Sequence, residues 1–365
     1  MAIIYTIYCK VTLWKSASEV PVIKAIDFFC GAGGLTRGLL DAGIEVLAGV
    51  DVDRRLQKTY EHNNAPSRFV CRDIKTIDIE ELRAELGIMP TDTVVYAACT
   101  PCQPFSTLNQ MKGEDERKHL LLAFAALVKQ APPDFILVEN VPGLNTAYGR
   151  EIYEQFAETL DACGFAEPAA DSLDAADYGV PQVRKRFILL ASRHGEIALP
   201  ARSVDEPATV EQYLKKYPVL ADGEKSTDYV NHAARKLPEH HKAIARAVPK
   251  DGGSRQDVRD TSILLKCHQE NPRVHKDVFG RMTWGKPAPT LTCRCTDIYC
   301  GRFTHPDQDR GLSLREAAAL QTFGDGYEFF GTFYHIAAQI GNAVPVKLAR
   351  QLGESITRAA AYLEG

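Results

Sequence analysis

Residues 24–38 of this 365-residue chain read KAIDFFCGAGGLTRG, an apolar run, then a glycine-rich turn, then a stretch with helical periodicity. Gly31, Gly33 and Gly34 let the backbone turn tightly and approach a ligand closely. The helix that follows would present free backbone N–H groups at its first turn, where a polar or anionic group can bind. Such a turn either binds a nucleoside cofactor or only connects a strand tightly to a helix.

The same order of strand, turn and helix repeats along the first half of the chain. Apolar runs predict buried strands at 24–29, 45–51, 68–73, 92–98, 134–140 and 186–192. Between them, apolar residues recur with helical spacing at 35–43, 54–63, 79–87, 119–130 and 149–164. Continuously apolar strands that alternate with helices are typical of an α/β fold with a doubly wound, mostly parallel, Rossmann-like sheet. Sheets of this kind bind ligands beyond the carboxyl ends of their strands.

The character of the sequence changes after Arg193. The next stretch is rich in Pro, Gly, Lys, Arg and His and has little periodicity, which predicts a smaller irregular domain. Helical patterns return at 313–323, where Ser313 and Glu316 have capping-box spacing, and at 344–363. We therefore expect an N-terminal extension (1–22), a catalytic domain (23–193), a smaller domain (194–280) and a C-terminal part (281–365) whose last helices return to the catalytic domain.

The composition of the chain limits the class of protein to which it can belong. The net charge is −4 and 45% of the residues are hydrophobic, as in an ordinary globular protein. No apolar run is long enough to span a membrane, and the first twenty residues lack the features of a signal peptide. Ten cysteines without a disulfide-framework spacing fit a reducing cytosol. Residues 231–281 hold 11 Lys/Arg against 6 Asp/Glu, so this window is either a surface for a polyanion or a solvated loop region.

Two aspartates stand at the ends of the second and third predicted strands. Asp51 closes "GVD" and Asp73 follows "RFVCR". Each could simply cap a helix, but an acidic group at this edge is also placed to accept hydrogen bonds from ribose hydroxyls or an adenine amino group. Together with the glycine turn they predict a nucleoside pocket. The G-A-G-G spacing disfavours a nicotinamide cofactor and favours an adenosine without a pyrophosphate, such as S-adenosylmethionine.

The segment "TPCQPFS" (100–106) follows the fourth predicted strand. Pro101 and Pro104 restrict the backbone around Cys102, and Gln103 and Ser106 add polar groups. Most cysteines are buried packing residues, but a thiol on so rigid a turn at a strand end is a candidate nucleophile if positive charge lies close by.

Three charged residues could serve that thiol. Glu139 ends the fifth apolar run, and burial of a carboxyl favours its protonated form, which suits a group that holds or donates a proton. Arg184 and Arg186 precede the sixth strand and share a face in extended conformation, so either could stabilise a thiolate or bind a phosphate or base oxygen. A buried structural hydrogen bond for Glu139, and a surface pair for the arginines, are the alternatives.

With these residues assembled, the chain resembles the cytosine-5 DNA methyltransferases from about Lys24 to Leu352. Six motifs occur in the order found in that family: DFFCGAGG, TPCQPFS, ENVPGL, QVRKR, RMTWGKPAPTLT and QIGNAVP. The resemblance implies a class I methyltransferase fold in which residues 23–193 bind S-adenosylmethionine and residues 194–280 form the target-recognition domain. The implied cofactor contacts are Phe29, Gly31, Gly33, Gly34, Asp51, Asp73 and Asn342.

The resemblance also implies the chemistry. Cys102 would be the nucleophile that adds to a cytosine, Glu139 would engage the target ring, and Arg184 and Arg186 would assist. The base must leave the duplex to reach a thiol, at an energetic cost of about a few kcal/mol. Thr290 would lie near the flipped nucleotide. The other expected DNA contacts are Gln103, Ser106, Arg255 and Arg259, and the polar stretch 109–119 would close over the base.

The expected enzyme uses S-adenosylmethionine, releases S-adenosylhomocysteine, needs no metal and methylates double-stranded DNA as a cytoplasmic, prokaryotic-type monomer. The cysteine cluster "CRCTDIYC" (293–300), even with Cys267 and His268, has poor spacing for a structural zinc site. A restriction endonuclease could be its functional partner. An RNA cytosine methyltransferase, a non-catalytic DNA-binding relative and a nicotinamide oxidoreductase remain as alternatives.

Overall fold

The computed structural model of the chain describes residues 22–362 apart from 102–118, 147–148, 166 and 273. Its centre is a seven-stranded sheet with the order β3-β2-β1-β4-β5-β7-β6. The strands are β1 (Ile23–Phe28), β2 (Glu45–Asp51), β3 (Arg68–Cys71), β4 (Thr93–Cys99), β5 (Phe135–Asn140), β6 (Ala169–Asp174) and β7 (Lys185–Ser192). The first five pair in parallel, whereas β7 runs antiparallel to both β5 and β6. The predicted doubly wound, mostly parallel sheet is confirmed.

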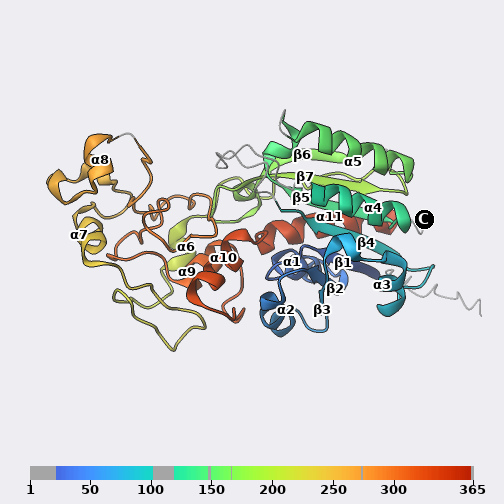
Figure 1. Ribbon diagram of the computed structural model, residues 1–365, viewed down its shortest axis with the longest axis horizontal. Helices are drawn as coiled ribbons and strands as arrows, with labels where there is room; N and C mark the ends of the chain where they lie inside the picture. The colour runs from blue at the N-terminus through green and yellow to red at the C-terminus, as the bar shows by residue number, and fades with distance from the viewer. Residues whose placement is uncertain (1–21, 102–118, 147–148, 166, 273, 363–365) are drawn as a thin grey trace, which may run out of the picture.

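Helices cover both faces of this sheet (Figure 1). One apolar cluster joins the sheet to α3 (Ile79–Glu85), α4 (Leu120–Gln130) and α5 (Arg150–Ala162). The cluster on the other face joins it to α1 (Gly34–Asp41) and α11 (Val346–Ala361). The side chains of β4 show why its sequence is apolar throughout, because Val94 and Tyr96 enter the first cluster while Val95 and Ala97 enter the second. The short α2 (Gln57–Asn64) packs beside β3.

The predicted strands agree with the observed ones to within two residues at either end. The exception is β6, an edge strand of sequence AADSLD that was not predicted, because it is largely exposed and carries no apolar alternation. The direction of β7 was not predicted either. Because β7 runs antiparallel to β5, it begins at the edge of the sheet where β5 ends. Arg184, just before β7, and Arg186, near its start, therefore lie at this edge.

The rest of the chain forms a smaller part with short helices. These are α6 (Val210–Leu214), α7 (Glu239–Ala247), α8 (Lys266–Glu270), α9 (Leu314–Leu320) and α10 (Phe333–Asn342). Figure 1 shows α7 and α8 at the end of the molecule away from the sheet. They surround a separate small core that includes Ile244, Val248, Leu264 and Phe279. Among the described residues, no helix is long and apolar enough to cross a membrane.

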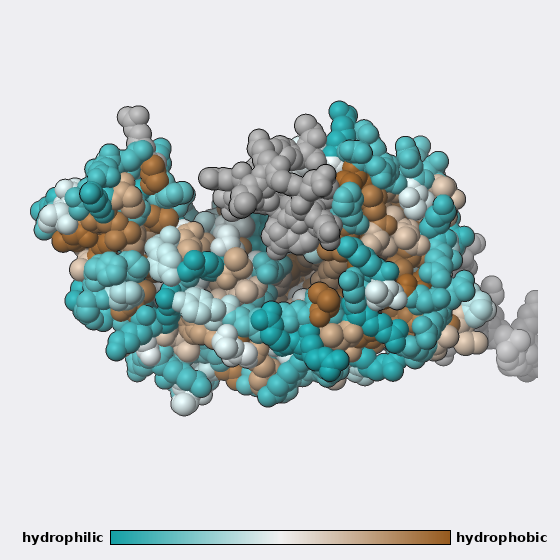
Figure 2. Space-filling view, viewed as in Figure 1, coloured by the Kyte–Doolittle hydropathy of each residue, from teal (hydrophilic) through white to brown (hydrophobic). Residues whose placement is uncertain are grey.

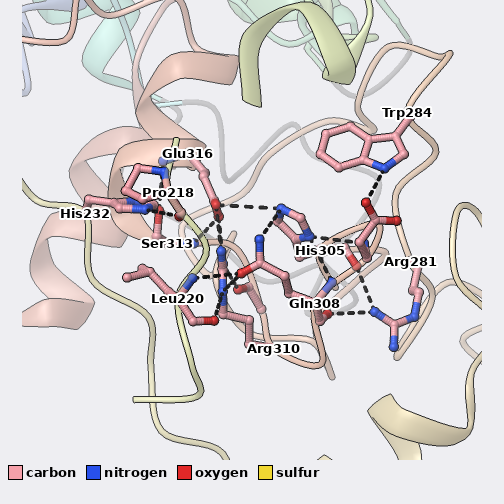
Figure 3. A network of polar contacts seen from close by, with 12 residues as sticks. Pro218, Leu220, His232, Arg281, Trp284, His305, Gln308, Arg310, Ser313 and Glu316 are labelled. Carbon is pink, nitrogen blue, oxygen red and sulfur yellow. Dashed lines mark hydrogen bonds and ion pairs between the residues drawn. The ribbon is translucent and has the colours of Figure 1, made fainter. Parts of the chain in front are cut away.

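A buried polar network fixes the loops of this smaller part to the start of α9 (Figure 3). Arg310 forms a bidentate ion pair with Glu316, with N–O distances of 2.7 and 2.8 Å. Ser313 caps α9 and forms the predicted capping box with Glu316. Burial alone would raise the pKa of Glu316, but the charge and hydrogen bonds of Arg310 outweigh it and hold that pKa at about 2. The carboxylate is therefore ionised, and paired, at neutral pH.

Arg281 extends the network toward α7. Its buried guanidinium donates to the backbone carbonyls of Val248, His305, Gln308 and Ala245, and it pairs with Asp309. Five donors on one fixed plane suit it to gather several loops at once. The smaller part is thus held together by buried arginines as well as by an apolar core.

Candidate active site

A cavity of about 1270 Å³ opens at the carboxyl ends of the parallel strands. Its walls come from the turn after β1, the ends of β2 to β5, the start of β7, residues 290–293 and α10. In Figure 2 the surface is hollowed between the part built on the sheet and the smaller part. The predicted site residues that line the cavity are Phe29, Gly31, Gly34, Asp51, Asp73, Glu139, Arg184, Arg186, Thr290 and Asn342.

The glycine turn after β1 supplies one wall. Phe29 and Gly31 both adopt positive φ, 60° and 56°. A Cβ on Gly31 would meet no atom within 4 Å, so this position leaves open space beside the cavity. A Cβ on Gly33 would lie only 2.3 Å from Asn64 Nδ2, and Gly33 does not line the cavity. Gly31 therefore leaves space at the cavity wall, whereas Gly33 packs closely against the Asn64 side chain of α2.

The two predicted strand-end aspartates differ in setting. Asp51 accepts the backbone N–H groups of Gly31 (3.1 Å) and Asp53 (2.9 Å), and burial raises its pKa. Asp73 is exposed and accepts the N–H of Lys75 (3.0 Å) as the cap of a short 3₁₀ turn. Asp51 is thus held rigidly in the cavity wall. Asp73 caps the 3₁₀ turn and also lies on the rim of the cavity.

A buried chain of hydroxyls lies beneath the glycine turn. Thr36 donates to Asp27 Oδ2 (2.6 Å) and contacts the hydroxyl of Tyr60, which in turn contacts Ser67. Asp27 is fully buried, and its Oδ1 atom has no hydrogen-bond partner in the described part of the chain. Burial raises the pKa of Asp27 from 3.8 to about 7. This group supports the turn and does not line the cavity.

The helix α10 closes the opposite wall. Asn342 ends it and is exposed to the cavity, and a Cβ on the preceding Gly341 would strike the backbone of Thr292. About one and two turns earlier, Gln339 Oε1 and His335 Nε2 are buried without a hydrogen-bond partner among the described residues, and both side chains line the cavity. These two residues were not predicted. Their four-residue spacing on one face of the helix that carries "GNAV" was the available signal.

Glu139 lies at the end of β5, and its side chain is 4% exposed. Its Oε1 atom is 2.9 Å from Arg186 Nε, and its Oε2 atom accepts the thiol of Cys99 at 2.9 Å. Because β4 and β5 are parallel and in register, Cys99 stands directly opposite Glu139. The carboxyl is thus contacted on both oxygens by side chains of neighbouring strands. Sequence analysis had not singled out Cys99.

The next residues of the same two strands meet on the other face of the sheet. Asn140 donates to Thr100 Oγ1 at 2.6 Å, and its Oδ1 accepts the N–H of Val141. This buried pair fixes the end of β4 to the end of β5. Pro101, which follows, lines the cavity. Cys102, Gln103 and Ser106, together with the loop predicted at 109–119 up to residue 118, lie outside the described residues.

Arg184 is buried and contacts backbone rather than solvent. Its guanidinium donates to the carbonyls of Leu291 (2.9 Å), Gly341 (3.2 Å) and Ala343 (3.1 Å). It therefore joins the start of β7 to the segment that carries Thr290 and to the end of α10. Arg184 lines the cavity, and its contacts assign it the positioning of two walls.

The residues predicted to contact DNA differ in how exposed they are. Thr290 is exposed on the cavity rim and donates to the carbonyl of Val183 at 2.7 Å. Arg259 is exposed in the smaller part. Arg255, in contrast, is buried, and its guanidinium donates to the carbonyls of Pro272, Val274 and His275. The prediction that Arg255 contacts DNA is therefore corrected, because its donors already bind the backbone of its own loop.

Among the described residues, no group of three or more His, Cys, Asp or Glu side chains is arranged to hold a metal ion. The three cysteines of 293–300 differ in their surroundings, since Cys295 is fully buried and Cys293 is exposed. The polar groups of the cavity include the carboxyl side chains of Asp51, Asp73 and Glu139, the backbone turn and the arginines described above.

A glycine turn after β1, an acidic residue after β2 and a seven-stranded sheet with one antiparallel strand define a class I methyltransferase. Two solved structures share this fold. One, described as a DNA modification methyltransferase encoded within an E. coli prophage, has a TM-score of 0.74 at 22% identity and covers 92% of this chain and 99% of its own. The other is the Dnmt2 methyltransferase of S. pombe, with a TM-score of 0.60 at 16% identity, covering 94% and 99%.

Comparisons of the sequence identify the family more specifically than the fold does. A model of the family described as C-5 cytosine-specific DNA methylase matches residues 23–358. The Type II methylase M.HgiDII of Herpetosiphon aurantiacus is 37% identical over 349 residues, 93% of this chain and 96% of that protein. The Type II methyltransferase M.XorII of Xanthomonas oryzae pv. oryzae is 32% identical over 365 residues, 92% and 84%. The chain belongs to the C-5 cytosine-specific DNA methylase family and is a DNA cytosine-5 methyltransferase. The oxidoreductase, non-catalytic and RNA-directed alternatives are set aside.

Proposed function

We propose that the chain transfers a methyl group from S-adenosylmethionine to carbon 5 of a cytosine that has been rotated out of duplex DNA. The observation that carries this proposal is the Glu139 carboxyl, buried beside Arg186 at the end of β5, in the same cavity as Asp51 and the glycine turn. A pocket for one small ligand is about 300–1000 Å³. The cavity of about 1270 Å³ has room for a cofactor and a base together.

The cofactor wall fits an adenosine-containing methyl donor. Open space at Gly31 admits the ligand close to the backbone, and Asp51 presents a fixed carboxylate to hydroxyl groups. Gln339 Oε1 and His335 Nε2 add buried polar atoms that have no hydrogen-bond partner in the described part of the chain. We assign Phe29, Gly31, Gly34, Asp51, Asp73 and Asn342 to the cofactor. When bound, S-adenosylmethionine supplies an electrophilic methyl group and leaves as S-adenosylhomocysteine.

The chain's own residues make carbon 5 reactive. The Cys102 thiolate adds to carbon 6, forming the S–C6 bond and moving an electron pair onto carbon 5. Glu139 donates a proton at ring nitrogen 3, where negative charge would otherwise develop. After carbon 5 has been methylated, its proton leaves to a base, the S–C6 bond breaks, and the thiolate is released. Nitrogen 3 returns its proton to Glu139, so that the enzyme is regenerated.

Arg186 and Arg184 have different tasks in this proposal. Arg186 lies 2.9 Å from Glu139 and brings positive charge to the reacting ring, whereas Arg184 holds the two walls that carry Thr290 and Asn342. Thr290, Arg259, Gln103 and Ser106 are assigned to DNA. The enzyme acts as a monomer in the cytoplasm, where its substrate lies. The Type II names of its relatives support a restriction endonuclease as its functional partner.

Bisulfite sequencing tests this function directly. Duplex DNA incubated with the protein and S-adenosylmethionine is expected to retain unconverted cytosine at one position of a short repeated site. The variant Cys102→Ser, incubated in parallel, is expected to leave every cytosine convertible while still binding the cofactor. Full conversion of DNA treated with the unaltered protein, or protection by Cys102→Ser, would contradict the proposal.

A further inference from the structure

We infer that Cys99 is a positioning residue for the Glu139 carboxyl, a second thiol that serves the reaction without attacking the base. The inference rests on the proposed role of Glu139 and deepens it. Cys99 is the last residue of β4, and its thiol donates to Glu139 Oε2 at 2.9 Å. Both residues line the cavity.

The register of the sheet makes this contact a fixed one. In parallel strands, residues in register point to the same face, and Cys99 is paired with Glu139 in the ladder between β4 and β5. The following pair, Thr100 and Asn140, is hydrogen-bonded on the opposite face at 2.6 Å. The ends of the two strands are therefore tied on both faces, which holds the backbones of Cys99 and Glu139 side by side.

The two oxygens of Glu139 are held by donors of different kinds. Arg186, from β7, supplies a permanent positive charge to Oε1, and Cys99, from β4, supplies a neutral and weak donor to Oε2. Rotation of the carboxyl about its terminal bond would break both contacts, so its plane is set before a base arrives. A catalytic group must be held to within about 0.5 Å and 10–20° of its productive geometry. Cys99 contributes to that orientation.

The inference gives Cys99 and Cys102 different roles. Cys102 needs to be a thiolate in order to attack, whereas Cys99 needs to keep its proton in order to donate it. The contact with Glu139 Oε2 at 2.9 Å gives the hydrogen of the Cys99 thiol an acceptor.

Three variants test the inference: Cys99→Ala, which removes the donor; Cys99→Ser, which keeps one; and Cys163→Ala as a control. Cys163 follows α5, and its side chain does not line the cavity. Single-turnover methylation by Cys99→Ala is expected to slow about 3- to 30-fold, the loss of one hydrogen bond that a weak donor makes to the Glu139 carboxyl. Cys99→Ser is expected to recover most of the rate, and Cys163→Ala to match the unaltered enzyme. The binding constants for DNA and S-adenosylmethionine should change little in all three.

A double-mutant cycle then asks whether Cys99 acts through Glu139. In a Glu139→Ala background, Cys99→Ala is expected to cause no further loss, because the group it positions is gone. An unchanged rate for Cys99→Ala, equal losses in Cys99→Ser and Cys99→Ala, or a full additional loss in the Glu139→Ala background would overturn the inference. If Glu139→Ala were itself as active as the unaltered enzyme, the proposed role of Glu139 would be wrong instead. Thermal unfolding of each variant verifies that it is folded.

Discussion

Arg186 and Glu139 lie on neighbouring strands that run in opposite directions, and their side chains meet 2.9 Å apart, between Arg186 Nε and Glu139 Oε1. The antiparallel direction of β7 is what makes this contact possible, because it brings the beginning of one strand to the end of the other. A carboxyl group that would otherwise be buried alone is thereby paired within the cavity.

Replacing Arg186 with alanine is expected to lower kcat by about 100-fold, because the reacting ring loses a preorganised positive charge and Glu139 loses the contact that holds its Oε1 atom. Arg186→Lys should recover only part of the rate, since an ammonium group does not reproduce the guanidinium geometry. Single-turnover kinetics measure both. Arg193→Ala, an exposed arginine just beyond the far end of the same strand, is the matched control and should be unaffected. Equal rates for the two alanine variants would contradict the role of Arg186.

Asp51→Asn is expected to weaken S-adenosylmethionine binding by about 10- to 100-fold, as an uncharged amide replaces a carboxylate that accepts hydroxyl groups. Calorimetric titration gives the dissociation constant. Asp41→Asn, on the exposed surface of α1 beside Arg37, controls for the general effect of removing an acidic residue. Unchanged affinity in Asp51→Asn would place the cofactor elsewhere.

Asp27 makes the stability of the fold depend on pH. Its folded-state pKa of about 7 is above its ordinary value of 3.8, so its protonated form stabilises the folded chain below pH 4 and this contribution is lost as the pH rises toward 7. Between these values the group alone gives a slope of about −1.4 kcal/mol per pH unit in the free energy of unfolding. Urea unfolding at several pH values should show a flatter dependence for Asp27→Asn. Parallel curves for the two proteins would argue against a raised pKa.

Glu316→Gln is expected to lower the free energy of unfolding by about 3–5 kcal/mol, because it leaves the buried Arg310 guanidinium without a counter-charge. Glu270→Gln is the control, since its ion pair with Lys266 is exposed and 3.8 Å long, and such pairs contribute about 0–1 kcal/mol. Urea unfolding measures both variants. A small loss for Glu316→Gln, comparable to the control, would show that the network is dispensable.

Arg255 and Arg259 are expected to separate stability from DNA binding. Arg255→Ala should lower the melting temperature, because three backbone carbonyls lose their donor. Arg259→Ala should leave the melting temperature unchanged and weaken DNA binding, with the slope of log K against log salt falling by about 1. Thermal unfolding and binding titrations at several salt concentrations distinguish the two. The reverse pattern would assign DNA contact to Arg255 after all.

Much of the fold follows from local patterns in the sequence. Continuously apolar runs identify the buried strands because both of their faces are covered, as in β4 and β5. The edge strand β6 escapes this rule because its side chains are largely exposed. The direction of β7 depends on how distant segments pack, and no local pattern encodes it.

The site likewise contains some residues that the sequence predicts and others that it does not. Asp51 and Glu139 were predictable because each stands at the end of an apolar run, and such ends gather at one edge of a parallel sheet. The contact of Cys99 with Glu139 depends on the register of two strands, and the burial of Arg255 depends on a loop that folds back over it. Charge in the sequence suggested a DNA surface for Arg255, whereas its tertiary surroundings give it a structural task.

The anchoring arginines of the smaller part bind mainly to main-chain carbonyls. Arg281 gathers those of Val248, His305, Gln308 and Ala245, and Arg315 gathers those of Gly324, Asp325 and Tyr327. A carbonyl is present whatever side chain its residue carries. Loops that are held in this way can therefore change the side chains at these positions and still keep the hydrogen bonds that anchor them.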